Sequence, residues 1–181
     1  MDAQDDRNAD RLVAKFGTYF VEYGTELYEA AAPHERLDVL IPDVLDYLQA
    51  SRDQLPAHPS PSILVTDFSP ANLMSRDGTP PESVEGLTGV IDLERAKLGP
   101  LEFAAVNAEY LLTRYIDDPE PVREALYDPL PFGPDVPRRD FYRVLAMGRS
   151  VAGLPHWYDP ESELYEQRAR AIASELDRIV R

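Results

Sequence analysis

Two aspartates in this chain each follow a short run of apolar and β-branched residues. The run 63–66 leads to Asp67, and the run 88–91 leads to Asp92. Asn72 stands five residues after Asp67, so a loop could turn both side chains toward one cleft. In phosphoryl transfer to a hydroxyl, an aspartate accepts the hydroxyl proton while an asparagine of the same loop holds magnesium. The pattern therefore predicts Asp67 as general base, with Asn72 and Asp92 as Mg²⁺ ligands, because Mg²⁺ prefers oxygen donors.

A simpler interpretation exists for part of this pattern. Asp67 stands at the end of the predicted strand, just before a Ser-Pro turn, and an aspartate there could merely cap that turn. The spacing to Asn72 and the second aspartate after a strand favour a site over a cap. Ser69 could contact a phosphate or the substrate hydroxyl, and turn capping is an equal alternative. No neighbouring His/Asp pattern accompanies Ser69, which argues against a serine hydrolase.

The segments Val65–Asn72 and Ile91–Glu94 resemble the catalytic and metal loops of the aminoglycoside phosphotransferase and choline kinase family, which has a protein-kinase-like fold. In that family the first loop reads His-Gly-Asp, then variable residues, then Asn. The second reads Ile-Asp-Phe/Trp-Glu/Asp. The resemblance implies that Asp67 is the catalytic base, that Asn72 and Asp92 bind Mg²⁺, and that Glu94 is an auxiliary metal carboxylate. It implies ATP as phosphoryl donor and a small-molecule hydroxyl as acceptor.

The chain departs from the family pattern in two places. Val65 and Thr66 replace the His-Gly pair before the catalytic aspartate. Residues 1–60 also lack a Gly-rich phosphate loop and a strand lysine, because Lys15 falls in a helical pattern. The resemblance therefore covers the C-terminal lobe only. It implies that the N-terminal nucleotide-binding lobe is absent from this chain and is lost, encoded upstream or supplied by a partner. Self-association over the open face is a further hypothesis.

The same residues are compatible with other classes of protein. A kinase-like lobe without catalysis could act as a binding or regulatory module, or could be a gene remnant. An unrelated helical domain with chance motifs is a third interpretation. The acidic residues Asp117, Asp118 and Glu120 would attract a cationic acceptor, although a solvated acidic face explains them equally well.

Charge and composition limit the partners of this 181-residue chain. The net charge is −15, and Lys15 and Lys97 are the only lysines. A dispersed acidic surface is typical of halophilic proteins, and the alternative is an acidic protein from an ordinary environment. Such a surface argues against nucleic acid and against anionic membranes. The absence of cysteine excludes disulfides and thiolate metal sites, and the acidic N-terminus is no secretory signal, so we expect a cytoplasmic protein.

The hydrophobic spacing predicts one α+β domain over residues 1–181, predominantly helical, with an acidic disordered tail at 1–9. Helices are expected over residues 8–31, 37–48, 101–117, 141–151 and 160–181, and strands over 62–65, 73–74 and 87–91. The strands should form one hairpin-like unit that carries both loops. Pro42 should kink or start its helix, Leu154–Tyr158 should break the next to last helix, and the histidines should lie in loops. The last helix should turn inward Leu164, Ala169, Ile172, Leu176 and Ile179.

Overall fold

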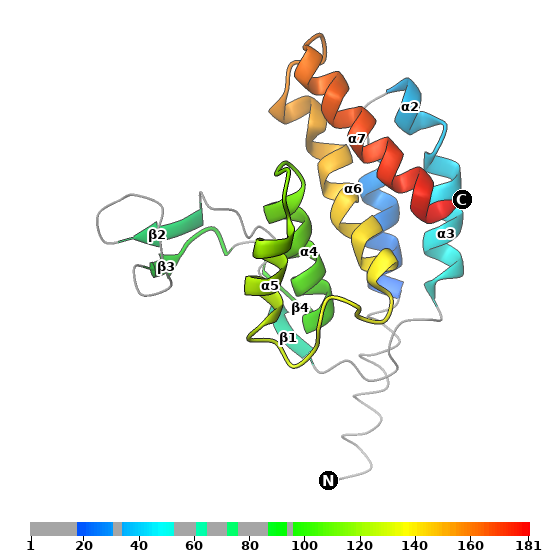
Figure 1. Ribbon diagram of the computed structural model, residues 1–181. Coiled ribbons are helices and arrows are strands. Elements are labelled where there is room, and N and C mark those ends of the chain that lie inside the picture. The colour runs from blue at the N-terminus through cyan, green and yellow to red at the C-terminus, as the bar shows by residue number, and fades with distance from the viewer. Residues whose placement is uncertain (1–17, 31–33, 53–60, 65–71, 76–86, 94–95) are drawn as a thin grey trace, which may run out of the picture. The chain divides into compact units, whose positions relative to one another are not determined.

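The computed structural model describes residues 18–30, 34–52, 61–64, 72–75, 87–93 and 96–181, drawn in colour in Figure 1. The described residues are mostly helical with short antiparallel strands, so the predicted α+β class is confirmed. Two compact units are present: Met1–Pro59 with Arg138–Arg181, and Ser60–Pro137. That the whole chain is one domain stays a prediction. No helix of the described part combines the length and apolarity needed to cross a membrane.

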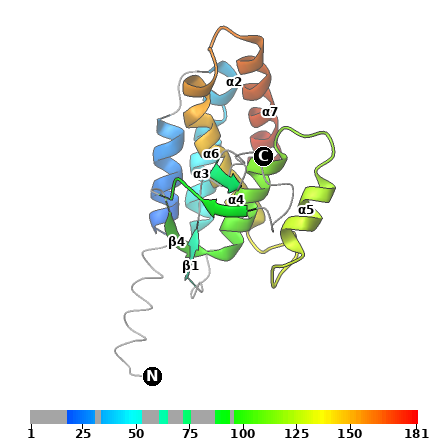
Figure 2. The ribbon, with the colours of Figure 1, turned by 90° about the vertical axis from the view of Figure 1, so that its left-hand side faces the viewer.

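The first unit is a helical bundle. Residues 18–29 form a helix, which is followed by α2 (Glu35–Asp38), α3 (Ile41–Ala50), α6 (Arg139–Trp157) and α7 (Glu163–Val180). Helix 18–29 lies alongside α6 in both ribbon views (Figures 1 and 2). Tyr28 donates a hydrogen bond of 2.7 Å from its hydroxyl to the Val144 carbonyl oxygen. A Cβ added to Gly24 would lie 2.7 Å from Leu145 Cδ2, so glycine at this position permits the close approach of the two helices.

Local capping explains where several of these helices begin. His34 is the N-cap of α2, and its Nδ1 accepts a hydrogen bond from the Arg36 backbone N–H. Pro42 lies in the first turn of α3, where its missing N–H costs no intrahelical bond, so it starts the helix. Ser162 caps α7 by accepting from Tyr165 N at 3.1 Å. The expectation that the histidines lie in loops is confirmed for His34, which precedes α2 in extended conformation, and is wrong for His156, which is inside α6.

Two predictions about the last helices are wrong. Helix α6 continues through Pro155 to Trp157, because a proline near the end of a helix removes only one hydrogen bond. In α7 the inward face begins at Tyr165, while Leu164 is exposed. The buried stripe of α7 consists of Tyr165, Ala169, Ile172, Ala173 and Leu176, at the three- and four-residue steps of one helix face.

A shared carboxylate links α2 to α7. Glu166 Oε2 lies 3.0 Å from His34 Nε2, while Glu166 Oε1 accepts from Arg36 Nε at 3.4 Å and from Arg170 Nη2 at 3.1 Å. Because His34 Nδ1 is an acceptor, the neutral ring carries its proton on Nε2 and donates it to Glu166. The hydrogen bonds from Arg170 and then from His34 hold the pKa of the Glu166 carboxyl below its ordinary value.

The second unit combines two small sheets with two helices. Strand β1 (Pro61–Leu64) pairs antiparallel with β4 (Lys97–Pro100), and β2 (Leu73–Ser75) pairs antiparallel with β3 (Leu87–Val90). The prediction of one hairpin-like unit is therefore wrong, because β4 was not expected and takes β1 as its partner. Helices α4 (Leu101–Thr113) and α5 (Glu120–Tyr127) follow directly.

A buried carboxylate joins α4 to α5. Glu109 is fully buried and accepts from Arg123 Nε at 2.9 Å and from the Tyr127 hydroxyl at 2.9 Å. Arg123 also donates to Glu120, whose side chain is 64% exposed. A buried charge is tolerated only when it is paired and hydrogen-bonded, and both conditions are met here.

We predict that Glu109→Ala lowers the free energy of unfolding by about 2–3 kcal/mol, because it leaves a partly buried guanidinium and a buried hydroxyl without their partner. Urea unfolding of the full chain measures this change. Glu120→Ala removes an exposed carboxylate from the same arginine and should cost less than about 0.5 kcal/mol. Equal costs for the two variants would contradict the assignment of Glu109 as the stabilising partner.

We further predict a pH-dependent contribution from Glu166. Since its pKa in the folded chain is lowered from 4.5, its stabilisation is complete above that value and is lost as the pH falls through the folded-state pKa. Stability measured against pH for wild type and Glu166→Gln should therefore converge only once the pH falls below the lowered folded-state pKa of Glu166. In an NMR titration, Arg170→Gln should raise the pKa of Glu166, and an unchanged pKa would refute the assigned cause.

Candidate active site

Strands β2 and β3 of the second unit form a two-stranded ladder, called the inner ladder because it lies between β1 and β4 in the sequence. Leu73 is opposite Val90 and Met74 is opposite Gly89, after which the register shifts by a bulge between Met74 and Ser75. The Thr88 hydroxyl donates to the Met74 carbonyl oxygen at 3.1 Å beside this bulge. The bulge and this hydrogen bond together fix the register of β2 against β3, because a shift of one strand by a residue would break both.

The pairing continues one step past the strands, into the predicted site. Ile91 N donates a hydrogen bond of 2.9 Å to the Asn72 carbonyl oxygen. Asn72 is thus opposite Ile91 and one position away from Asp92 along the ladder. The structure brings together these two residues, which the sequence predicts as metal ligands from separate loops.

Asp92 ends this ladder in an unusual backbone conformation. Its φ is 60°, in the left-handed region, and it is exposed, as are its neighbours Ile91 and Leu93. Aspartate tolerates this region better than most residues because its short polar side chain can bond locally. Such backbone conformations gather at functional sites, so the observed φ adds a structural reason to consider Asp92 a site residue. Asn72 is half-buried in a single 3₁₀ turn before β2.

The strand that precedes Asp67 does not neighbour the strand that precedes Asp92. Ile63 of β1 is opposite Leu98 of β4, which corrects the expectation that the two acidic loops leave adjacent strands. The order is nested instead: the outer pair β1–β4 encloses the inner pair β2–β3 in sequence. Each connecting segment, 65–72 and 91–96, therefore joins the same two ladders. One ladder ends at the pair Leu64–Lys97, and the other continues to the backbone bond of Asn72.

The structure does not describe the other predicted site residues. Asp67, Ser69 and Glu94 lie outside the described residues, so their roles stay predictions. Among the described residues, no group of three or more histidine, cysteine or acidic side chains could hold a metal ion. Asn72 and Asp92 offer an amide and a carboxylate oxygen, and this donor set fits Mg²⁺ better than a softer metal.

The acidic stretch before α5 is largely occupied by local interactions. Asp118 Oδ1 accepts from the Glu120 backbone N–H at 3.3 Å, and Glu120 is paired with Arg123. Asp117 is exposed. The stretch therefore acts first as the start of α5, and attraction of a cationic acceptor stays a prediction.

Comparison with protein-family models, with curated proteins and with solved structures finds no match to this chain. The resemblance to phosphotransferases consequently depends on the quoted sequence motifs.

The first unit also has a groove that was not predicted from the sequence, and Arg36 and Arg170 are among the residues that line it. One signal was present: Glu166 and Arg170 stand four residues apart on α7, a spacing that favours an ion pair. The contribution of Arg36 has no such signal, because it approaches from a helix 130 positions earlier in the chain.

The left-handed φ of Asp92 yields a stability prediction. Asp92→Asn should change the free energy of unfolding by less than about 0.5 kcal/mol, because asparagine also tolerates this conformation. Asp92→Val should cost about 1–2 kcal/mol, because a β-branched side chain clashes there. Leu93→Val, at the adjacent exposed position with negative φ, is the control in thermal or urea unfolding. Equal stability of the two Asp92 variants would argue against the strained backbone.

Proposed function

We propose that this chain is the C-terminal lobe of an ATP- and Mg²⁺-dependent small-molecule phosphotransferase of the protein-kinase-like fold. The lobe holds the catalytic base and the metal ligands, and it transfers a phosphoryl group to a small-molecule hydroxyl. The alternative is a kinase-like lobe that binds or regulates without catalysis.

One observation carries the proposal: the hydrogen bond from Ile91 N to the Asn72 carbonyl oxygen, 2.9 Å long, within the nested strand order. It supports a common site because Asn72 ends one acidic segment and Asp92 begins the other. The segment that contains Asp67 leaves Leu64 of the outer ladder and ends at Asn72.

Each residue has a distinct role in the proposed reaction. Asp67 accepts the proton of the acceptor hydroxyl, so that the hydroxyl oxygen can attack the terminal phosphorus of ATP as the bond to ADP breaks. The Asn72 amide oxygen and the Asp92 carboxylate hold Mg²⁺, with Glu94 as an auxiliary carboxylate and Ser69 near the phosphate or hydroxyl. Bound Mg²⁺ would neutralise negative charge on the phosphate oxygens.

The charge of the chain sets the conditions and the partners of the proposed reaction. With a net charge of −15, an anionic nucleotide is repelled at low salt, so we expect function in a saline cytoplasm where carboxylates are screened. Nucleic acid and anionic membranes are poor partners for the same reason. A nucleotide-binding lobe in trans would supply the adenine pocket and the phosphate-binding lysine.

Calorimetry of Mg²⁺·ATP binding by the full chain in molar salt tests the proposal. We expect measurable binding at millimolar ATP that disappears when EDTA removes the metal. Asp92→Asn should weaken this binding about tenfold or more, since a charge-assisted metal contact is lost while the backbone conformation is kept. Asp128→Asn, an exposed carboxylate of the same unit, is the matched control and should bind as wild type.

Turnover measurements separate the enzyme from the non-catalytic lobe. If an acceptor is phosphorylated, Asp67→Asn should lower kcat about a thousandfold and leave ATP affinity nearly unchanged. Unchanged turnover would refute Asp67 as the base. Binding of Mg²⁺·ATP without turnover would favour the regulatory alternative, and no binding at millimolar ATP would contradict catalysis by this chain alone.

A further inference from the structure

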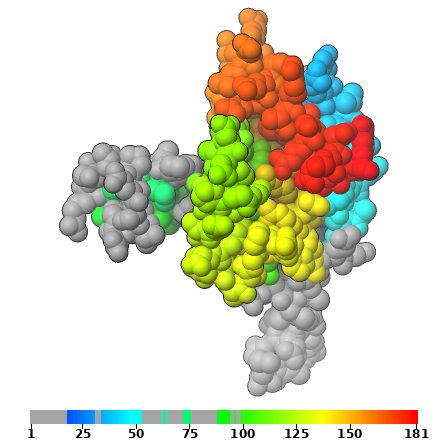
Figure 3. Space-filling model, in the orientation of Figure 1, coloured from blue at the N-terminus to red at the C-terminus, as the bar shows by residue number. Residues whose placement is uncertain are grey.

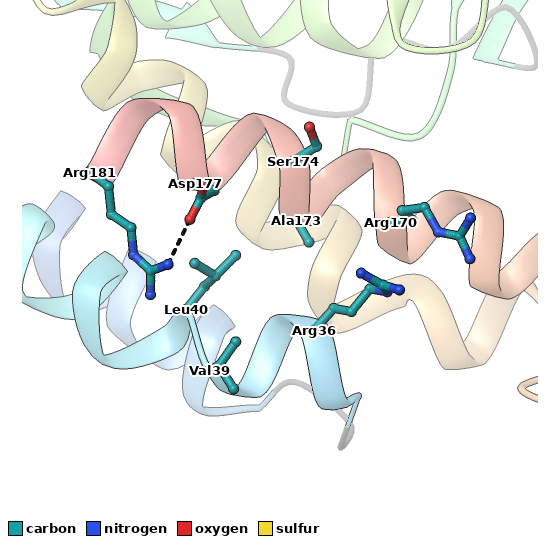
Figure 4. A pocket seen from close by; sticks show the side chains of 8 residues that line it. All are labelled: Arg36, Val39, Leu40, Arg170, Ala173, Ser174, Asp177 and Arg181. Carbon is teal, nitrogen blue, oxygen red and sulfur yellow. Dashed lines mark hydrogen bonds and ion pairs between the residues drawn. The ribbon is translucent and has the colours of Figure 1, made fainter.

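A groove lies on the first unit between α2, the start of α3 and the C-terminal half of α7 (Figure 4). Its cavity volume is about 390 Å³, which falls within the range of small-molecule sites. In the space-filling view, α7 in orange and red lies next to the blue and cyan surface of α2 and α3 (Figure 3). All of its lining residues belong to the unit formed by Met1–Pro59 and Arg138–Arg181.

One end of the groove carries two guanidinium groups. Arg36 from α2 and Arg170 from α7 lie at the same end of it (Figure 4), and both donate to the same oxygen of Glu166. Their side chains are 48% and 62% exposed, and among the described residues each donates one side-chain hydrogen bond, to Glu166. A guanidinium has about five N–H groups, so most donors at this end remain available to another acceptor.

The ion-paired group at this end, counted by itself, carries a charge opposite in sign to that of the chain. Glu166 is the one carboxylate of the described residues that contacts either guanidinium, and it is shared with His34. With His34 neutral, two arginines and one glutamate sum to +1, in a chain whose net charge is −15. Paired guanidiniums match the planar fork of a carboxylate, so this end is suited to a carboxylate ligand.

The middle of the groove is apolar, and the arginine at the far end is paired with two carboxylates. Leu40 and Ala173 are 4% and 7% exposed and form the floor, and Val39 stands at the rim with 65% exposed. At the far end Arg181 is bound by Asp43 at 2.8 Å and by Asp177 at 2.9 Å. One arginine with two carboxylates leaves this end at −1, so an anionic group is repelled there and attracted to the other end.

We propose that this groove binds a small organic anion, a monocarboxylate with a short apolar body. The carboxylate lies between Arg36 and Arg170 and accepts N–H groups that Glu166 does not use. The apolar body lies against the exposed Val39 side chain, above Leu40 and Ala173, and removes this apolar surface from water. This site is independent of the proposed phosphotransferase function, because it shares no residue with the Asn72–Asp92 region.

An NMR titration of the full chain at constant ionic strength tests the proposal. The probes are hexanoate, hexylammonium with a similar apolar body and opposite charge, and acetate with the same charge and almost no body. We expect saturable shifts for hexanoate on α2 and α7, with an affinity at least tenfold higher than for either other probe. Hexanoate that fails to saturate by tens of millimolar, or hexylammonium that binds equally well, would overturn the proposal.

Variants locate the binding. The double variant Arg36→Gln and Arg170→Gln should weaken hexanoate binding at least tenfold, whereas Arg178→Gln, an exposed arginine of the same helix outside the groove, should leave it unchanged. Val39→Asp provides a second test that removes no side chain of an ion pair and adds a carboxylate at an exposed rim position, where it repels an anionic ligand or competes with it for Arg36. Wild-type affinity in both the double variant and Val39→Asp would place binding elsewhere and refute the site.

Discussion

The nested pairing of four short strands is the constraint on which the candidate active site depends. The ladder of β1 and β4 and the ladder of β2 and β3 are both only a few residues long, so neither would be stable alone in water. The register is held by backbone bonds and by the bulge beside Met74, and it ends at the bond between Ile91 and Asn72. This bond places Asp92, whose backbone is in the left-handed region, next to Asn72 of the other loop.

Two carboxylates of this acidic chain each accept hydrogen bonds from more than one side chain, and arginine is a donor to both. Buried Glu109 is satisfied by Arg123 and by the Tyr127 hydroxyl, and it holds α5 on α4. Partly exposed Glu166 of α7 joins α2 to α7 through two donors, His34 and Arg36, and also accepts from Arg170 of its own helix. Arginine suits both places because its planar group bonds several acceptors while keeping its charge. At Glu166 this leaves further N–H groups of Arg36 and Arg170 available, and the anion binding that we propose for the groove depends on them.

Most of the helices could be predicted from the sequence, because their apolar residues recur at three- and four-residue steps; helix α5, Glu120–Tyr127, was not expected. The strand before Asp67 and those beside Asn72 and Asp92 were also expected, to within a residue or two. Strand β4 was not, since Lys97–Pro100 contains glycine and proline, which read as a loop leading into α4. The inward face of α7 was misjudged by one position at Leu164, because hydropathy alone does not show which of two adjacent apolar residues meets a neighbour.

The sequence by itself determined the fold class and the acidic character, and it supplied the residues that we propose as magnesium ligands, because these follow from composition and local spacing. Only the tertiary structure decided which strands pair, and hence that Asn72 meets the backbone beside Asp92. It alone also brought Arg36 to Arg170, whose positions are far apart in the chain. The reason is physical: long-range pairing depends on backbone hydrogen bonds and side-chain packing between segments, and neither leaves a periodic signal in one segment.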